Sequence, residues 1–292
     1  MAQTRRLADA DVFPIGLGAM AMSLAGRPDE AQSIRTIHAA LDAGINLVDT
    51  ADSYCLDETE YGHNEGLIAR ALRGRRDGVI VATKGGHTRI GGDWNLNGSP
   101  EHLRAACERS LRALETDRID LYQFHRPDPA VPYAESIGAI KRLQDEGKVR
   151  WIGISNADPD QIEEARSIAD VVSVQNELSL EFTTPLTKGE LRLCEQHGMA
   201  LLPWSPLGGI GRAGDAPGRY DAVAEAARAH GVSPQQVALA WLLALSPVVI
   251  PIPGASRPET IRDSVRAAEL ELTGEQLDAI AEAAGVAEHV RA

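Results

Sequence analysis

The chain has 292 residues, of which 43% are hydrophobic and 24% charged, and its formal net charge is −13. This composition is typical of a globular protein with a sizeable core, and the acidic balance argues against general binding to nucleic acids or anionic membranes. No apolar run reaches the ~18 residues of a membrane helix, and the N-terminal stretch lacks the apolar segment of a signal peptide. Three scattered cysteines indicate neither a disulfide framework nor a zinc site, so we expect a cytoplasmic protein that holds no metal.

Short apolar runs alternate with longer amphipathic stretches along the chain. Segment 1–14 precedes the first run and is predicted to form a hairpin that closes the bottom of a barrel. Residues 207–218 are rich in glycine and are predicted to form a mobile loop. Eight runs have the length of a buried parallel strand, and they span residues 15–20, 45–50, 79–84, 119–125, 150–156, 171–177, 200–206 and 248–254.

The stretches between the runs carry helix signals. In each of three cases a capping side chain stands directly before a proline at the first helical position. These pairs are Ser99-Pro100, Asp158-Pro159 and Ser233-Pro234. Eight strand–helix units predict an α/β fold, a single (β/α)8 TIM barrel domain over residues 1–292. A doubly wound sheet is the alternative, but it usually has fewer strands, and the first run reads IGLGAM instead of its G-x-G-x-x-G fingerprint.

Polar side chains stand at the ends of seven consecutive predicted strands. In a (β/α)8 barrel these ends form the face on which the active site lies. One polar residue at a strand end is usually a capping or turn residue, but seven in succession are expected to converge on one pocket. From the second strand to the eighth, the residues are Asp49, Lys84, His125, Ser155 with Asn156, Gln175 with Asn176, Trp204 with Ser205, and Ser256 with Arg257 just beyond Gly254.

Tyr54 follows Asp49 by five residues and completes a set of groups suited to proton transfer. The ordinary pKa of tyrosine is about 10, and a lysine ammonium within ~4–6 Å lowers it. We therefore expect Asp49 to hold Lys84 and Lys84 to lower the pKa of Tyr54. His125 would orient a substrate oxygen. With these neighbours, Tyr54 could deliver a proton to a developing alkoxide.

Four motifs, in order, resemble the signature of the aldo-keto reductases. They are ALDAGINLVDTADSY, SLRALETDRIDLYQFHRPD, GKVRWIGISN and LLPWSPLGG, and the similarity runs from about residue 12 to 270. The resemblance implies a (β/α)8 barrel that reduces carbonyl compounds with a nicotinamide cofactor, usually the phosphorylated one, and without a metal. It also implies a catalytic tetrad of Asp49, Tyr54, Lys84 and His125.

The same resemblance implies the cofactor contacts. Ser155, Asn156 and Gln175 would bind the nicotinamide carboxamide, and Trp204 would stack on its ring. Ser205, Leu207 and Gly208 match a loop that covers the pyrophosphate, and Asp263 stands where related sequences bind adenine with a glutamate. Ser264 replaces a common asparagine and is a weaker adenine partner.

The tail of the cofactor is expected next to IPGASRPETIRDS. Ser256 and Arg257 precede a helix that is predicted to begin at Pro258. A helix N-terminus with an arginine is a good phosphate site, which favours NADPH over NADH. The expected partners are thus NADPH and a small carbonyl compound. A capped surface helix with an exposed arginine is the structural alternative.

Other functions and roles remain open from the sequence. Some relatives are auxiliary subunits of potassium channels that hold cofactor with little turnover, and Lys84 could serve as the Schiff-base lysine of a barrel aldolase. Cys55 is interpreted as a small buried filler and alternatively as an oxidation-sensitive thiol. Trp94, on a glycine-rich loop, suits packing and substrate contact equally. The acidic cluster of Asp57, Glu58 and Glu60 is either solvated or directed against anionic substrates.

Overall fold

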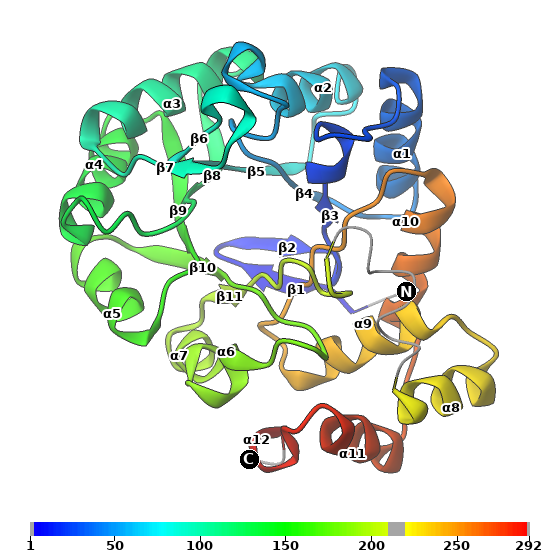
Figure 1. Ribbon diagram of the computed structural model, residues 1–292. Coiled ribbons are helices and arrows are strands. Elements are labelled where there is room, and N and C mark those ends of the chain that lie inside the picture. Colours follow the sequence, from blue (N-terminus) through cyan, green and yellow to red (C-terminus); the bar gives the residue numbers. More distant parts are fainter. Residues whose placement is uncertain (1–2, 210–219, 291–292) are drawn as a thin grey trace.

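The computed structural model describes residues 3–209 and 220–290. Within them, a parallel sheet of seven strands curves around a central axis in the order β11-β10-β9-β8-β5-β4-β3 (Figure 1). Helices form a ring outside it. The strands are β3 (Leu17–Gly18), β4 (Leu47–Asp49), β5 (Ile80–Gly85), β8 (Ile119–Phe124), β9 (Val149–Ser155), β10 (Val171–Gln175) and β11 (Ala200–Leu201).

The eighth predicted run, 248–254, closes the ring without forming a regular strand. Its backbone N–H groups at Ile250 and Ile252 donate to β11 and to Pro203, and Gly16 and Gly18 donate to carbonyls on its other side. Single parallel bridges join the segment to β3 and β11. The ladder is incomplete because prolines at 251 and 253 have no N–H to offer. The (β/α)8 architecture predicted from the sequence is confirmed.

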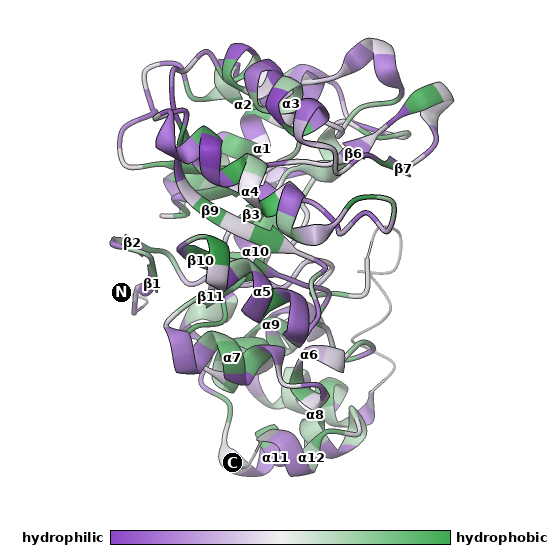
Figure 2. Cartoon of the chain, turned by 90° about the vertical axis from the view of Figure 1, so that its left-hand side faces the viewer, coloured by the Kyte–Doolittle hydropathy of each residue, from purple (hydrophilic) through white to green (hydrophobic). Residues whose placement is uncertain are grey.

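The predicted N-terminal hairpin consists of β1 (Arg5–Leu7) and β2 (Ala10–Val12), which pair antiparallel. Leu7 and Val12 are fully buried against side chains that fill the barrel interior. Figure 2 shows this hairpin at the opposite end of the barrel from a second hairpin, β6 (His87–Thr88) with β7 (Asn95–Leu96). The first hairpin closes the bottom, as predicted, and leaves the other end open for a site.

The sequence signals for helix starts are confirmed. The Ser99 side chain accepts from the backbone N–H of His102, Ser233 accepts from Gln236, and Asp158 forms a full capping box with Gln161. The longer helices are α1 (Glu30–Asp42), α2 (His63–Ala71), α3 (Pro100–Ala113), α4 (Tyr133–Asp145), α5 (Pro159–Ile168), α7 (Glu190–His197), α8 (Asp221–His230), α9 (Pro234–Leu245), α10 (Pro258–Val265) and α11 (Gly274–Ala283), with short α6 (Thr184–Thr187) and α12 (Ala287–Val290).

Several sequence expectations concern single features of the fold. The three cysteines are free and buried, and burial raises the pKa of the Cys55 thiol to about 12, as expected of a filler. Within the described residues, no helix is long and apolar enough to cross a bilayer. Of the predicted loop at 207–218, residues 210–218 lie outside the described part of the chain.

Candidate active site

Lys84 joins the residues that the sequence placed in a catalytic set. It lies near the end of β5 with its side chain fully buried. Its Nζ donates to Asp49 Oδ1 at 2.5 Å, to the Thr50 carbonyl at 2.8 Å and to the Tyr54 hydroxyl at 3.1 Å. The last distance is well inside the ~4–6 Å over which a charge shifts a neighbouring pKa. The predicted chain of contacts from Asp49 through Lys84 to Tyr54 is therefore present.

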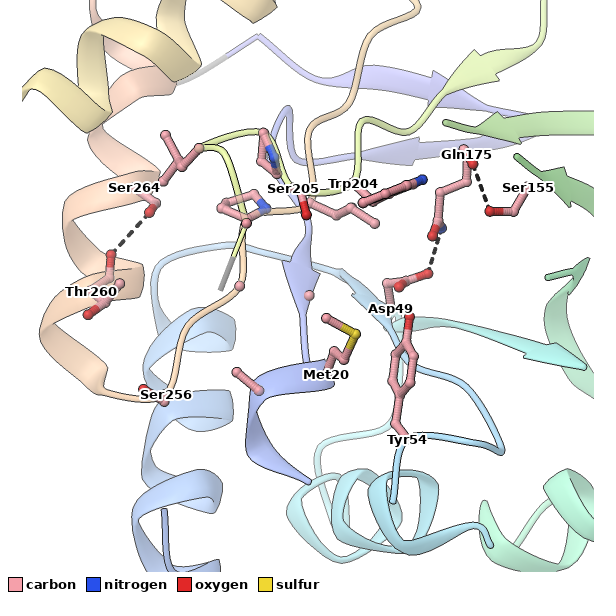
Figure 3. Close-up of a pocket in the computed structure, with 18 of the residues that line it drawn as sticks. Met20, Asp49, Tyr54, Ser155, Gln175, Trp204, Ser205, Ser256, Thr260 and Ser264 are labelled. Carbon is pink, nitrogen blue, oxygen red and sulfur yellow. Dashed lines mark hydrogen bonds between the residues drawn. The ribbon is translucent and has the colours of Figure 1, made fainter. Parts of the chain in front are cut away.

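The second carboxylate oxygen of Asp49 accepts hydrogen bonds from two buried side-chain amides. Gln175 Nε2 donates to Asp49 Oδ2 at 2.8 Å, and Gln123 Nε2 does so at 3.2 Å (Figure 3 shows the first bond). A buried carboxylate is stable only when it is paired and hydrogen-bonded, and here both conditions are met. Gln123 was not among the predicted site residues, because only His125 was taken from the end of the predicted strand 119–125, and Gln123 lies two residues before it.

Burial changes the proton affinity of the lysine and the tyrosine in ways that the sequence did not show. Burial alone would lower the pKa of Lys84, but the Asp49 carboxylate and the Tyr54 phenol outweigh it and raise the pKa. Burial raises the pKa of Tyr54, and the opposing effect of Lys84 does not cancel it. The expectation of a lowered tyrosine pKa was therefore wrong in sign, because it left out desolvation. Both side chains hold their protons near neutral pH.

His125 faces Tyr54 across the end of β8. The two ring centroids are 5.8 Å apart and the rings are nearly perpendicular, while the His87 ring lies 4.3 Å from His125. Burial, with smaller contributions from His87 and Lys84, lowers the pKa of His125 well below its usual range. His125 is thus neutral near neutral pH. His87, which the sequence analysis did not single out, is kept in place by a hydrogen bond to the Asn95 carbonyl on β7.

A cavity of about 950 Å³ begins at Tyr54 and His125 and extends to α10 (Figure 3). Lys84 and Gly208 are not among its lining residues, although Gly209 is. The other residues of the predicted site all line it: Asp49, Tyr54, His125, Ser155, Asn156, Gln175, Trp204, Ser205, Leu207, Gly254, Ser256, Arg257 and Asp263. The structure therefore brings together almost the whole set that the sequence predicted.

The amides predicted to bind nicotinamide are oriented by neighbouring strands. Asn156 Nδ2 donates to the His125 carbonyl at 2.9 Å, and Ser155 Oγ donates to the Gln175 carbonyl at 2.7 Å. Trp204 lines the same part of the cavity, and its buried indole N–H has no hydrogen-bond partner among the residues that the structure describes. These groups combine a polar edge with an aromatic surface, as a nicotinamide amide and ring require.

The far end of the cavity fits a phosphate group. Helix α10 begins at Pro258, as predicted, and Arg257 is its exposed N-cap residue without a side-chain capping bond. Because the Arg257 side chain does not cap the helix, the first N–H groups of α10 can bind an anion. A Cβ built on Gly254 would meet nothing closer than a backbone oxygen at 3.9 Å, so there is room beside the helix.

The two predicted adenine residues make contacts within the protein. The Asp263 carboxylate accepts from Ser233 Oγ at 2.6 Å and from Gln236 Nε2 at 2.5 Å, which ties α10 to the start of α9. Ser264 Oγ donates to the Thr260 carbonyl at 3.1 Å (Figure 3). Because each carboxylate oxygen can accept more than one bond, the adenine role of Asp263 remains a prediction.

Trp94 and the acidic cluster, for which the sequence left two interpretations each, have different surroundings. Trp94 lines the cavity, is 44% exposed and stacks on the Arg89 guanidinium, so both interpretations of it from the sequence have support. The acidic cluster does not line the cavity. Glu60 pairs with Arg27, Asp57 caps a 3-10 turn, and Glu58 accepts from the Gly91 N–H, so these carboxylates hold loops together.

A buried polar cluster lies behind the site. Asp52 accepts from Arg109 at 3.1 Å, and Glu65 accepts from Thr83 at 2.6 Å; neither carboxylate lines the cavity. Burial raises the pKa of Asp52 to about 6 and, with the nearby Asp52 charge, that of Glu65 to about 8. Within the described residues, no group of three or more His, Cys, Asp or Glu could hold a metal ion.

This cluster predicts how stability depends on pH. Between its ordinary pKa of 4.5 and about 8, Glu65 binds a proton in the folded state but not in the unfolded state. The free energy of unfolding therefore falls as pH rises through this range. Glu65→Gln should remove this dependence on pH. At pH 9 its free energy of unfolding, measured with urea, should exceed that of the wild type by on the order of 2 kcal/mol. The exposed Glu271→Gln is the control, and equal slopes in both variants would contradict the prediction.

Comparisons with known proteins agree with this geometry. A model of the aldo/keto reductase family matches residues 14–284. An uncharacterized oxidoreductase of Schizosaccharomyces pombe is 37% identical over 281 residues, which cover 94% of this chain and 87% of that protein. The solved structure of a glycerol dehydrogenase from Gluconobacter oxydans has a TM-score of 0.82 at 30% identity and covers 99% of this chain and 96% of its own.

A solved aldo-keto reductase from Klebsiella pneumoniae, in complex with NADPH, has a TM-score of 0.81 at 28% identity, with 97% of this chain and 95% of that chain covered. The barrel and the family match together define an NAD(P)H-dependent oxidoreductase. The chain belongs to the aldo/keto reductase family.

Proposed function

We propose that the enzyme reduces the carbonyl group of a small aldehyde or ketone with NADPH and that Tyr54 supplies the proton. The observation that carries this proposal is the buried Lys84 ammonium, which contacts both Asp49 and the Tyr54 hydroxyl at the base of the cavity. When bound, the cofactor supplies a hydride to the carbonyl carbon. The residues of the chain then have to position the substrate oxygen and transfer one proton.

The tetrad residues have separate tasks in this reaction. The raised pKa of Tyr54 keeps its hydroxyl protonated until negative charge develops on the substrate oxygen. The O–H bond of Tyr54 then breaks as its proton moves to that oxygen, and the Lys84 ammonium at 3.1 Å stabilises the phenolate that remains. His125, neutral and facing Tyr54, orients the substrate oxygen. Asp49 keeps Lys84 charged and fixed.

The cofactor would extend along the cavity from Tyr54 to α10. We assign the nicotinamide amide to Ser155, Asn156 and Gln175 and its ring to Trp204. Ser205, Leu207 and Gly208 would cover the pyrophosphate, Asp263 would contact adenine, and the 2′-phosphate would bind at Gly254, Ser256 and Arg257. The neighbour from Klebsiella pneumoniae that was crystallised with NADPH supports this choice of cofactor.

Arg257→Ala should weaken NADPH binding roughly ten- to hundredfold and affect NADH much less. A charge-assisted contact to a phosphate contributes about 1.5–3 kcal/mol, and NADH has no 2′-phosphate. Dissociation constants from quenching of Trp204 fluorescence measure both effects. Arg262→Ala removes an exposed arginine from the same helix and is the matched control. Equal losses for both cofactors would show that Arg257 only supports the fold.

The overall proposal is tested by a panel of aldehydes and ketones, with NADPH and NADH oxidation followed by absorbance. We expect turnover with NADPH on at least one class of carbonyl compound. Slow turnover of every compound, together with tight cofactor binding, would instead indicate a regulatory subunit that holds the cofactor. The Schiff-base alternative needs an uncharged lysine amine, whereas the pKa of Lys84 is raised by Asp49 and Tyr54 despite burial.

A further inference from the structure

Among the described residues, the side chains that line the Tyr54 end of the cavity carry little charge apart from one arginine. Met20, Trp94 and the neutral His87 and His125 contribute apolar or polar surface. The Asp49 carboxylate is compensated by Lys84 at 2.5 Å. The other charged lining residues, apart from one arginine, belong to the start of α10 or to its body, where the cofactor tail is assigned.

That arginine is Arg126, which directly follows His125 after β8. Its side chain is exposed, lines the cavity, and has no carboxylate within 4.0 Å among the described residues. Two other arginines of the described chain do have charged or aromatic partners: Arg27 bonds Glu60, and Arg89 lies against the Trp94 ring. An unpaired guanidinium in a cavity of an acidic protein points to an anion supplied by a ligand.

The guanidinium is oriented by a side chain of the site itself. Arg126 Nη2 donates to Asn156 Oδ1 at 3.0 Å, and Asn156 in turn donates to the His125 carbonyl at 2.9 Å. This is one bond for a group with five N–H donors, so donors remain for a second acceptor. A planar fork with two N–H groups matches the two oxygens of a carboxylate.

The charges around Arg126 agree with this role. Its positive charge lowers the pKa of His125, of His87 and of Glu177, in each case by less than the effect of burial. Glu177 is the carboxylate that it affects, but Glu177 forms no ion pair with it and does not line the cavity. The positive charge therefore reaches the part of the cavity where the substrate carbonyl would meet Tyr54.

We infer that Arg126 binds a carboxylate of the substrate, so that the enzyme prefers carbonyl compounds that also carry a carboxylate group. This inference rests on the proposed carbonyl reduction, because it names the substrate class of the same site. Phosphate esters of carbonyl compounds share the anionic chemistry. Among the described residues, the Arg126 guanidinium is the one cation that lines this end of the cavity, and its flat fork favours the singly charged, planar carboxylate.

The test compares 4-carboxybenzaldehyde with its methyl ester, methyl 4-formylbenzoate. The two compounds present the same aldehyde and differ in one negative charge. In the wild-type enzyme we expect a higher kcat/KM for the carboxylate, mainly through a lower KM. In Arg126→Gln the ratio of the two kcat/KM values should fall about tenfold, as expected for one lost charge-assisted contact, while Arg126→Lys should retain part of it.

Because Arg126 contacts Asn156, the substitution can also change cofactor binding. Such a change affects both aldehydes equally and therefore cancels in the ratio of their kcat/KM values. Raising the salt concentration should lower the wild-type ratio and leave that of Arg126→Gln unchanged, because ions screen the exposed guanidinium. Arg192→Gln, which removes an exposed arginine outside the cavity, is the control for net charge. An unchanged ratio in Arg126→Gln would overturn the inference, whereas no turnover of either aldehyde would count against the proposed function instead.

Discussion

Replacing Tyr54 with phenylalanine should leave a folded, cofactor-binding protein whose carbonyl reduction is about 10²–10⁴-fold slower, the range expected for a lost general acid. The fold should survive because the Tyr54 hydroxyl is one of three oxygens that accept from Lys84 Nζ. Without it, the ammonium keeps Asp49 and the Thr50 carbonyl. We expect a loss of about 0.5–1.5 kcal/mol in unfolding free energy, the usual contribution of one hydrogen bond.

The sequence also allows a structural interpretation of Tyr54, in which the ring only packs against the strand end and Asp49 holds its hydroxyl. That interpretation predicts the opposite pattern, a destabilised protein with normal turnover. Asp49 instead receives its bonds from Lys84, Gln123 and Gln175, so Tyr54→Phe leaves those bonds intact. Melting temperature, NADPH binding by Trp204 fluorescence, and turnover on a good substrate should be measured on the same preparation. A folded, cofactor-loaded variant with near-wild-type turnover would end the proposed mechanism.

The fold could be predicted because buried parallel strands and capped helices leave strong local patterns. The eighth segment shows the limit of that approach. Its apolar pattern predicted a strand, and the segment does lie between β11 and β3, but Pro251 and Pro253 remove donors and leave only single bridges. Pro203 likewise lies two residues beyond the end of the short β11. The pattern indicates where a segment lies, while the hydrogen-bond ladder depends on each N–H.

The grouping of the tetrad residues could be predicted because Asp49, Lys84 and His125 stand at or near strand ends, which converge in any barrel of this kind, and Tyr54 follows β4 closely. Gln123 and His87 were missed for two different reasons. Gln123 lies one residue before the end of β8, and its direction follows from the register that pairs it with Lys84 on β5. His87 meets His125 through the β6–β7 hairpin, which has no periodic signal. The sign of the Tyr54 pKa shift also depends on burial, which the sequence does not quantify.

Lys84→Met should abolish measurable carbonyl reduction and also destabilise the fold. Lys84 and Asp49 form a buried pair, with 1% and 4% of their side chains exposed. Removing the ammonium leaves Asp49 Oδ1 without its charged partner, and an uncompensated buried charge costs about 3–5 kcal/mol. The Tyr54 phenolate would also lose the cation that stabilises it. Urea unfolding and single-turnover reduction with bound NADPH measure the two effects separately.

The double variant Lys84→Met/Asp49→Asn distinguishes catalysis from charge balance. Asparagine has nearly the shape of aspartate and no charge, so we expect the double variant to regain most of the lost unfolding free energy. Turnover should remain at least 10²-fold below wild type, because neither substitution restores a cation 3.1 Å from the Tyr54 hydroxyl. If turnover returned together with stability, Lys84 would serve only to neutralise Asp49. The tyrosine would then donate its proton without help from the lysine.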